Sequence, residues 1–270
     1  EAGAAARHLV ACSVGETGPQ SLSNLQARVV ASGHADDVLG AEAAAQLAEL
    51  MRRRSAREPI QYLIGEWDFH MLTLKVRPPI LVPRPETEEL VEYILAELRT
   101  EGERLGLGLG TTTPIRILDI GAGSGAIGLA LVAALPGVTC VGIDPNMEAV
   151  VLASENAAML GLEGRYECLH ASLEEFVSRG GDGDVGGSGG KGATSTAPTF
   201  DLVVSNPPYI PRPDMAALEP EVRVYEDDAA LCGGTDGLDI VRQILHAAPG
   251  LLGRDGRGER GEGGQGGAGL

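Results

Sequence analysis

The chain has 270 residues, of which 43% are hydrophobic but only 3% aromatic. This length suits one domain of about 170–200 residues plus a small second one, with a mostly aliphatic core. The formal charge of -17 at pH 7 lacks the basic footprint of proteins that grip a nucleic-acid backbone, and no apolar run approaches the roughly 18 residues of a membrane span. We therefore expect no direct contact with nucleic acid and no membrane span.

The cysteines and histidines give no sign of a disulfide framework or a metal site. The five histidines are scattered, and no CxxC pair occurs. Free thiols in a reducing compartment are expected. The cysteines are Cys12, Cys140, Cys168 and Cys232.

Residues 1–66 are predicted to form an N-terminal helical domain. The stretch from Ala41 to Met51 combines strong helix formers with apolar residues at helical spacing. The basic run Arg52 to Arg54 follows, where cations favour a helix end. We interpret this run as a solvated helix terminus and not as a nucleic-acid contact.

Residues 67–82 are predicted to be a hairpin linker. Alternating apolar and polar residues over 69–76 indicate a strand. Pro78 and Pro79 then break the chain before a second short run at 80–82. A helix with carboxylates at its start is predicted over 87–98.

Residues 83–250 are predicted to form the main domain, of the α/β class. Strands alternating with helices imply a parallel sheet covered on both faces, as in Rossmann-like folds. The expected strands are 115–120, 139–143, 166–169 and 200–204, and the expected intervening helices include 126–135 and 150–160. Two segments lack an apolar face: a flexible Gly/Ser/Thr-rich insertion at 180–199 and a disordered Gly-rich tail at 251–270.

The loop from Asp119 to Gly125 lies between a predicted strand and a helix. Its glycines allow a tight turn and a close approach of backbone amides to a ligand. The spacing G-x-G-x-G differs from the dinucleotide pattern G-x-G-x-x-G and resembles motif I of class I methyltransferases, which bind S-adenosylmethionine. The resemblance implies a cofactor site with the acid near the amino-acid end of the cofactor. Its residues are Asp119, Gly121, Ala122, Gly123, Ser124 and Gly125.

Two further cofactor contacts are expected at the ends of the next two strands. Asp144 follows Asp119 by 25 residues and can accept both ribose hydroxyls of a nucleoside, a device that nicotinamide cofactors share. The same residue could cap the following helix, and the two roles are compatible. Ser172 stands at the predicted adenine contact, where many methyltransferases carry Asp.

The sequence from Asn206 to Tyr209, Asn-Pro-Pro-Tyr, follows the fourth predicted strand directly. Pro207 and Pro208 exclude both helix and central strand, so a rigid corner is expected at the carboxyl edge of the sheet. The Oδ1 of Asn206 and the carbonyl of Pro207 can each accept one N–H of a planar nitrogen, turning its lone pair toward the methyl group. Tyr209 offers a flat face to such an acceptor, and Asn206 also borders the cofactor.

Together these motifs resemble the HemK/PrmC family of protein-(glutamine-N(5)) methyltransferases over residues 58 to about 250. Further stretches carry the resemblance: Glu58 to Phe69, Val82 to Glu88, Tyr225 to Leu231 and Gly233 to Leu238. The resemblance implies that S-adenosylmethionine methylates the glutamine in the Gly-Gly-Gln motif of a peptide chain release factor. It also implies that the helical domain engages that factor.

Two features depart from the family, and two alternatives stay open. Ser172 replaces an acid, and the final strands of the family sheet are expected to be missing after residue 250. The chain could instead be a methyltransferase of the exocyclic amine of adenine in DNA or RNA. Such enzymes use a similar tetrapeptide. It could also be a truncated, non-catalytic binding protein. We expect a monomer, in a mitochondrion or other organelle for a eukaryotic source and in the cytoplasm for a bacterial one.

Overall fold

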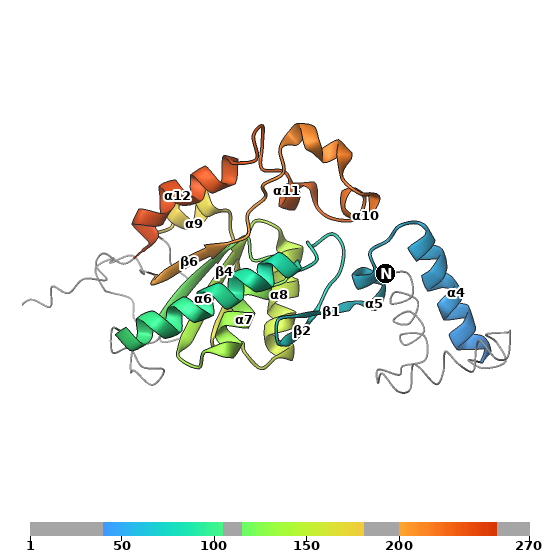
Figure 1. The fold of residues 1–270 in the computed structure, drawn as a ribbon, viewed down its shortest axis with the longest axis horizontal. Helices are drawn as coiled ribbons and strands as arrows, with labels where there is room; N and C mark the ends of the chain where they lie inside the picture. Colours follow the sequence, from blue (N-terminus) through green and yellow to red (C-terminus); the bar gives the residue numbers. More distant parts are fainter. Residues whose placement is uncertain (1–39, 105–114, 181–199, 253–270) are drawn as a thin grey trace, which may run out of the picture.

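A computed structural model describes residues 40–104, 115–180 and 200–252. Figure 1 shows a sheet flanked by helices, a hairpin, and a small helical region beside them. Most of the predicted helical domain and nearly all of the predicted insertion and tail fall outside these ranges. None of the described helices is long and apolar enough to cross a membrane.

The described part of the helical region consists of α4 (Ala41–Ser55) and α5 (Ile60–Ile64), as predicted. Leu50 and Leu63 form its small buried core. The basic run ending α4 is only partly the solvated terminus that was expected. Arg52 is exposed, but Arg54 forms an ion pair of 3.2 Å with Glu221, far along the chain. That contact links the helical region to the segment after the sheet.

The hairpin is confirmed, but its strands were misplaced. β1 (Glu66–Phe69) pairs antiparallel with β2 (Leu72–Lys75). The single strand predicted over 69–76 is wrong because the chain reverses at its start. His70 lies in this turn with φ 55, in the left-handed region, without the Asn-Gly or Gly signal that usually marks a hairpin turn. Residues 80–82 form no strand.

The sheet has the parallel arrangement predicted from the alternation of strands and helices. Its strands are β3 (Ile115–Ile120), β4 (Val138–Asp144), β5 (Tyr166–His170) and β6 (Leu202–Ser205), in the order β5-β4-β3-β6. The chain builds outward from β3 through β4 to β5, and then returns to the other side of β3. The strand order therefore reverses between β3 and β6, where open α/β sheets bind ligands.

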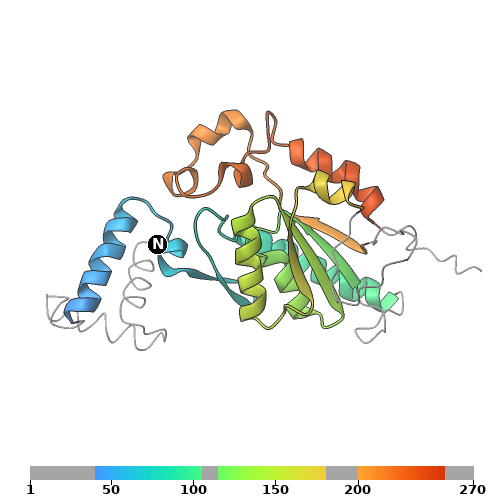
Figure 2. The same ribbon diagram turned by 180° about the vertical axis from the view of Figure 1, so that it is seen from behind.

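Helices cover both faces of the sheet (Figures 1 and 2). Alternate side chains of β3 go to the two layers: Ile117 joins the larger core and Leu118 the smaller one. The larger core includes side chains of α6 (Pro85–Arg104), α7 (Ala126–Ala134) and α8 (Met147–Met159). The smaller core involves α9 (Leu173–Ser178) and α12 (Asp239–Leu251).

Residues after β6 arch from the sheet toward the helical region (Figure 1). They include η1 (Arg212–Ala217), α10 (Pro220–Arg223) and α11 (Asp228–Leu231). The tail predicted from residue 251 is wrong at its first two residues. Leu251 is buried in the smaller core, and Leu252 forms a parallel bridge with Phe200 beside β6. The expected loss of final strands concerns residues beyond the described ranges and stays a prediction.

Candidate functional site

The predicted site residues gather at the carboxyl edge of the sheet because neighbouring strands end in register. Ile120 pairs with Ser205 on one side and with Ile143 on the other. The residues that follow, Gly121, Asn206 and Asp144, are therefore adjacent, since neighbouring strands lie about 4.8 Å apart. A hydrogen bond of 2.6 Å from Ser205 Oγ to the carbonyl of Ile120 ties the two strand ends together.

The glycine loop has the backbone that its sequence predicts. Gly121, Gly123 and Gly125 have φ values of 73, 58 and 82, in the region that favours glycine. A Cβ at Gly121 would meet nothing within 4 Å, whereas one at Gly125 would lie 3.0 Å from the Tyr166 hydroxyl. Gly121 thus leaves space for a ligand, a Cβ at Gly123 would lie 4.0 Å from the Ile80 side chain, and Gly125 allows close packing. The side chains of Ala122 and Ser124 belong to buried residues, so exposed contacts from this loop come from its backbone.

Asp119 lies at the base of the loop and is only 1% exposed. Its Oδ2 accepts a hydrogen bond of 3.1 Å from Gly128 N–H. Its Oδ1 has no partner in the described part of the chain. Burial raises the pKa of Asp119 to about 7. The hydrogen bond from Gly128 N–H lowers this pKa, and the nearby charge of Asp144 raises it further. An unpartnered buried acceptor of this kind fits a ligand that brings a positive charge.

Asp144 is held by two backbone donors at the end of β4. Its Oδ2 accepts from Gly123 N–H at 2.9 Å and its Oδ1 from Asn146 N–H at 2.8 Å. Burial raises the pKa of Asp144, and these two donors oppose the shift. Asp144 is not the cap of the following helix, as was considered from the sequence. The cap of α8 is Asn146, whose Oδ1 accepts from Glu148 N–H at 2.9 Å. A carboxylate has about four acceptor sites, so Asp144 keeps capacity for two ligand hydroxyls.

Ser172 lies beyond the end of β5 and caps α9. Its hydroxyl accepts from Glu175 N–H at 3.2 Å, and Glu175 Oε2 accepts from Ser172 N–H at 3.0 Å. The two bonds form a capping box. The contact of Ser172 with an adenine stays a prediction. Its side chain would have to make that contact while also capping α9.

Asn206 to Tyr209, here called the acceptor corner, is braced from behind by the Gly-rich stretch 233–237. A Cβ at Gly233 would come within 2.6 Å of the Pro208 carbonyl oxygen, and one at Gly237 would collide with that of Tyr209. Gly233 N–H also donates to the Ile210 carbonyl at 2.9 Å. Tyr209 itself is 65% exposed, so its ring is open to an acceptor group. These contacts explain Gly233 and Gly237 of the Gly233 to Leu238 motif.

Thr87 is a site residue that the sequence did not single out. It lies in the first turn of α6, and its Oγ1 accepts a hydrogen bond of 3.3 Å from Asn206 Nδ2. The two residues are 119 positions apart. Spacing along the chain gives no signal for such a contact, although Thr87 falls within the Val82 to Glu88 stretch quoted for the resemblance.

Two side-chain contacts made by residues 226 and 227 were also missed. Arg84 Nη2 binds Glu226 Oε1 at 2.7 Å, and the Glu226 side chain is 1% exposed. Burial raises the pKa of Glu226, while Arg84 favours its charged form. Asn146 Nδ2 donates to Asp227 Oδ2 at 3.2 Å. The chain after β6 therefore contacts both the cofactor side and the start of α6.

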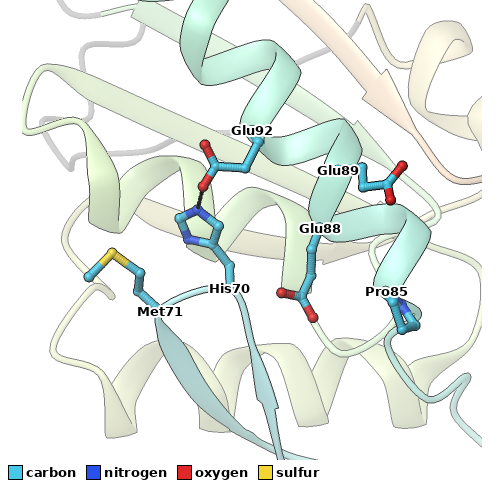
Figure 3. A pocket seen from close by; sticks show the side chains of 6 residues that line it. All are labelled: His70, Met71, Pro85, Glu88, Glu89 and Glu92. Atoms are coloured by element: carbon cyan, nitrogen blue, oxygen red, sulfur yellow. Dashed lines mark hydrogen bonds and ion pairs between the residues drawn. The ribbon is translucent and has the colours of Figure 1, made fainter.

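A separate cavity of about 540 Å³ lies between the hairpin turn and α6 (Figure 3). His70 Nε2 and Glu92 Oε1 are 2.6 Å apart in its wall. None of the predicted site residues lines this cavity; the lining residues are His70, Met71, Pro85, Glu88, Glu89 and Glu92. Among the residues that the structure describes, no group of three or more His, Cys, Asp or Glu is arranged to hold a metal ion.

Comparison with known proteins agrees with the resemblance drawn from the motifs. Residues 28–65 match the model of the PrmC N-terminal domain, and residues 107–181 match that of the methyltransferase small domain. A human protein named MTRF1L release factor glutamine methyltransferase is 41% identical over 208 residues, covering 76% of this chain and 56% of that protein. The release factor glutamine methyltransferase of Geobacter sulfurreducens is 40% identical over 214 residues, covering 79% of this chain and 64% of its own.

A third relative, the release factor glutamine methyltransferase of Rhodospirillum rubrum, is 42% identical over 217 residues, covering 80% of this chain and 57% of its own. The chain thus spans less than two thirds of the length of these relatives. The predicted family resemblance and the Rossmann-like fold are confirmed.

Proposed function

We propose that this chain transfers the methyl group of S-adenosylmethionine to the side-chain amide nitrogen of a glutamine, in the Gly-Gly-Gln motif of a peptide chain release factor. The observation that carries the proposal is the adjacency of Gly121 and Asn206 at the reversal of strand order. A cofactor loop and an acceptor corner side by side are what a direct transfer between two bound molecules requires. The names of the relatives support the choice of substrate.

The residues on the cofactor side suit S-adenosylmethionine, which supplies an electrophilic methyl group on a sulfonium. Asp144 has acceptor capacity left for the two ribose hydroxyls. The unpartnered Oδ1 of Asp119 suits the cationic amino-acid end. The open space over Gly121 allows the close approach of a ligand to the backbone. Ser172 is proposed to contact the adenine.

On the acceptor side, the chain orients a nitrogen that is a poor nucleophile because its lone pair is delocalised over the amide. Asn206 Oδ1 and the Pro207 carbonyl each accept one N–H of the substrate carboxamide. Orientation of this kind can contribute roughly 7–11 kcal/mol to lowering a barrier in favourable cases. The same two acceptors stabilise the positive charge that develops on nitrogen. Tyr209 packs its exposed ring against the planar carboxamide.

The proposal extends to the partner and the place of action. The helical region engages the release factor, and the chain acts as a monomer without binding nucleic acid directly. The net charge of -17 supports the absence of a nucleic-acid contact. A mitochondrial or other organellar location is proposed for a eukaryotic source, on the composition of the insertion at 180–199, and a cytoplasmic one for a bacterial source.

One labelling experiment separates the proposal from its alternatives. The protein is incubated with radiolabelled S-adenosylmethionine and, in parallel, a release factor, its Gln→Ala variant in the Gly-Gly-Gln motif, and DNA or RNA. Label on the intact release factor alone supports the proposal. Label on nucleic acid would instead assign the adenine reaction. No label on any substrate, from a protein that still binds the cofactor, would assign a non-catalytic binding protein.

A further inference from the structure

Within the described part of the chain, the side chain of Asn206 makes one hydrogen bond, from Nδ2 to Thr87 Oγ1 at 3.3 Å. Thr87 is 9% exposed, so little solvent competes for this contact. Asn206 follows β6, while Thr87 lies in the first turn of α6, on an element that precedes the whole sheet. The acceptor corner is thus anchored to a helix from outside its own strand and loop.

The direction of this bond matters because the two ends of a carboxamide have nearly the same shape and opposite hydrogen-bonding character. Packing alone distinguishes them poorly. With Nδ2 committed to Thr87, Oδ1 is the end left for a substrate N–H. With the amide turned by 180°, Nδ2 would face the substrate N–H, and the substrate amide would not be held. The Thr87 hydroxyl can accept or donate, so the orientation follows from the bond in which Nδ2 donates to it.

The two prolines that follow Asn206 keep Oδ1 from being used locally. An Asn side-chain oxygen commonly accepts the backbone N–H two residues further on, in an Asx turn. Here that residue is Pro208, which has no N–H, and Pro207 has none either. The sequence therefore removes the nearest donors for Oδ1, and Thr87 occupies Nδ2.

Thr87 is itself held in place. Pro85 begins α6 with a φ that suits a first helical turn, and Thr87 N–H donates to the Arg84 carbonyl at 3.0 Å. The Arg84 guanidinium is in turn bound by the buried carboxylate of Glu226. A Thr side chain in a helix has two main χ1 rotamers, and the bond from Asn206 is made by the one that the structure shows.

We propose that Thr87 is a positioning residue that fixes the orientation of the Asn206 carboxamide, so that Oδ1 faces the nitrogen to be methylated. This inference rests on the proposed function for its kinetic consequence. Its structural content, the hydrogen bond and the orientation of the amide, can be tested without any substrate.

The kinetic test compares Thr87→Val, which keeps the shape and removes the hydroxyl, with Thr87→Ser, which keeps the hydroxyl. Thr87→Val is expected to lower kcat for a release factor about 10-fold, the effect of one lost hydrogen bond. The KM for S-adenosylmethionine should stay within about 2-fold, because the cofactor contacts are unchanged. Thr87→Ser should restore kcat to within about 3-fold of the parent. Thr100→Val, an exposed change on the same helix, is the matched control.

The spectroscopic test follows the side-chain NH₂ of Asn206 by ¹H–¹⁵N correlation spectra of the full chain, with the signals assigned from their loss in Asn206→Asp. They are expected to move and sharpen in Thr87→Val and to keep their positions in Thr87→Ser. Unchanged signals in Thr87→Val, or a Ser variant as impaired as the Val variant, would overturn the inference. If the parent methylates no release factor, the proposed function fails, and the spectra alone still decide the role of Thr87.

Discussion

On the cofactor side of the carboxyl edge, the hydrogen bonds accepted by the two carboxylates, Asp119 and Asp144, span short stretches of chain. Asp144 binds Asn146 two residues away and Gly123 21 residues away, and Asp119 binds Gly128 nine residues away. In the acceptor corner the bond from Asn206 spans 119 residues. The corner is also braced by the glycines of 233–237. The glycine loop, Asp119 and Asp144 therefore belong to one βαβ unit, β3-α7-β4, whereas the acceptor corner is built from three distant segments.

The two halves should therefore fail in different ways. The backbone of the cofactor loop is set by its own positive-φ glycines and by β3 and β4, so it resists changes elsewhere. The acceptor corner depends on Thr87 and on the glycines of 233–237, whose contacts described above are with the corner itself. A change in any of these residues should impair transfer while cofactor binding persists.

Asn206→Ala removes the acceptor side chain and should separate the two halves most clearly. We expect transfer to a release factor to fall by about 100-fold or more, since orientation and charge stabilisation are both lost. Affinity for S-adenosylmethionine, measured by calorimetry, should stay within a few-fold. Full turnover by this variant would show that Asn206 does not hold the acceptor.

Gly237→Ala tests the brace. Gly237 has φ 80, and an added Cβ would collide with the Tyr209 carbonyl oxygen. We expect kcat for the release factor to drop about 30- to 100-fold, because the corner must shift, with little change in cofactor affinity. Gly161→Ala is the control: its φ is 67 and an added Cβ meets nothing within 4 Å, so it isolates the backbone strain. Equal losses in both variants would exclude a specific brace.

The same separation explains how far the sequence could predict the molecule. The strands, the glycine loop and Asp144 were predicted because periodicity and local turn chemistry fix them. The hairpin register was not, since His70 adopts a left-handed φ without a glycine signal. Thr87 and Glu226 were not singled out either, because their roles arise from tertiary contacts between segments distant in sequence. The distant residues that support the acceptor corner can be identified only in the folded chain.

Asp119→Asn tests whether the buried carboxyl of Asp119 lowers the free energy of unfolding when it is charged. Burial raises the pKa of Asp119 to about 7 in the folded chain, against about 4 when unfolded. The folded state binds this proton more tightly, so between these values raising the pH lowers the free energy of unfolding. From pH 5 to 7 we expect Asp119 to account for a loss of about 2 kcal/mol, absent in the Asn variant.

Urea denaturation of both proteins at pH 5, 6 and 7 measures this difference. Asp144 and Glu226 also have raised pKa values and give slopes of the same sign. Both remain in the Asn variant, so the contribution of Glu226 cancels, and that of Asp144 cancels apart from its interaction with Asp119. Identical pH slopes for the two proteins would mean that Asp119 is not the buried titrating group. A steeper loss in the variant would reverse the assigned sign.

Asp227→Ser probes a segment after β6 that contacts both halves. Asp227 Oδ1 caps α11, and its Oδ2 accepts from Asn146, whose backbone N–H holds Asp144. Serine retains the cap but is too short to reach Asn146 as well. We expect affinity for S-adenosylmethionine to weaken about 3- to 10-fold, the effect of one lost hydrogen bond, with kcat at saturating cofactor nearly unchanged.

Calorimetry for the cofactor and single-turnover transfer to the release factor measure the two effects of Asp227→Ser separately. Asp228→Ala, at the next and exposed position, is the control for a change in local charge. A fall in both quantities would mean that residues 226–239, which contact Asn146 at one end and the acceptor corner at the other, transmit the state of the cofactor side to the corner. The two halves would then be separate in their supports but coupled through this segment.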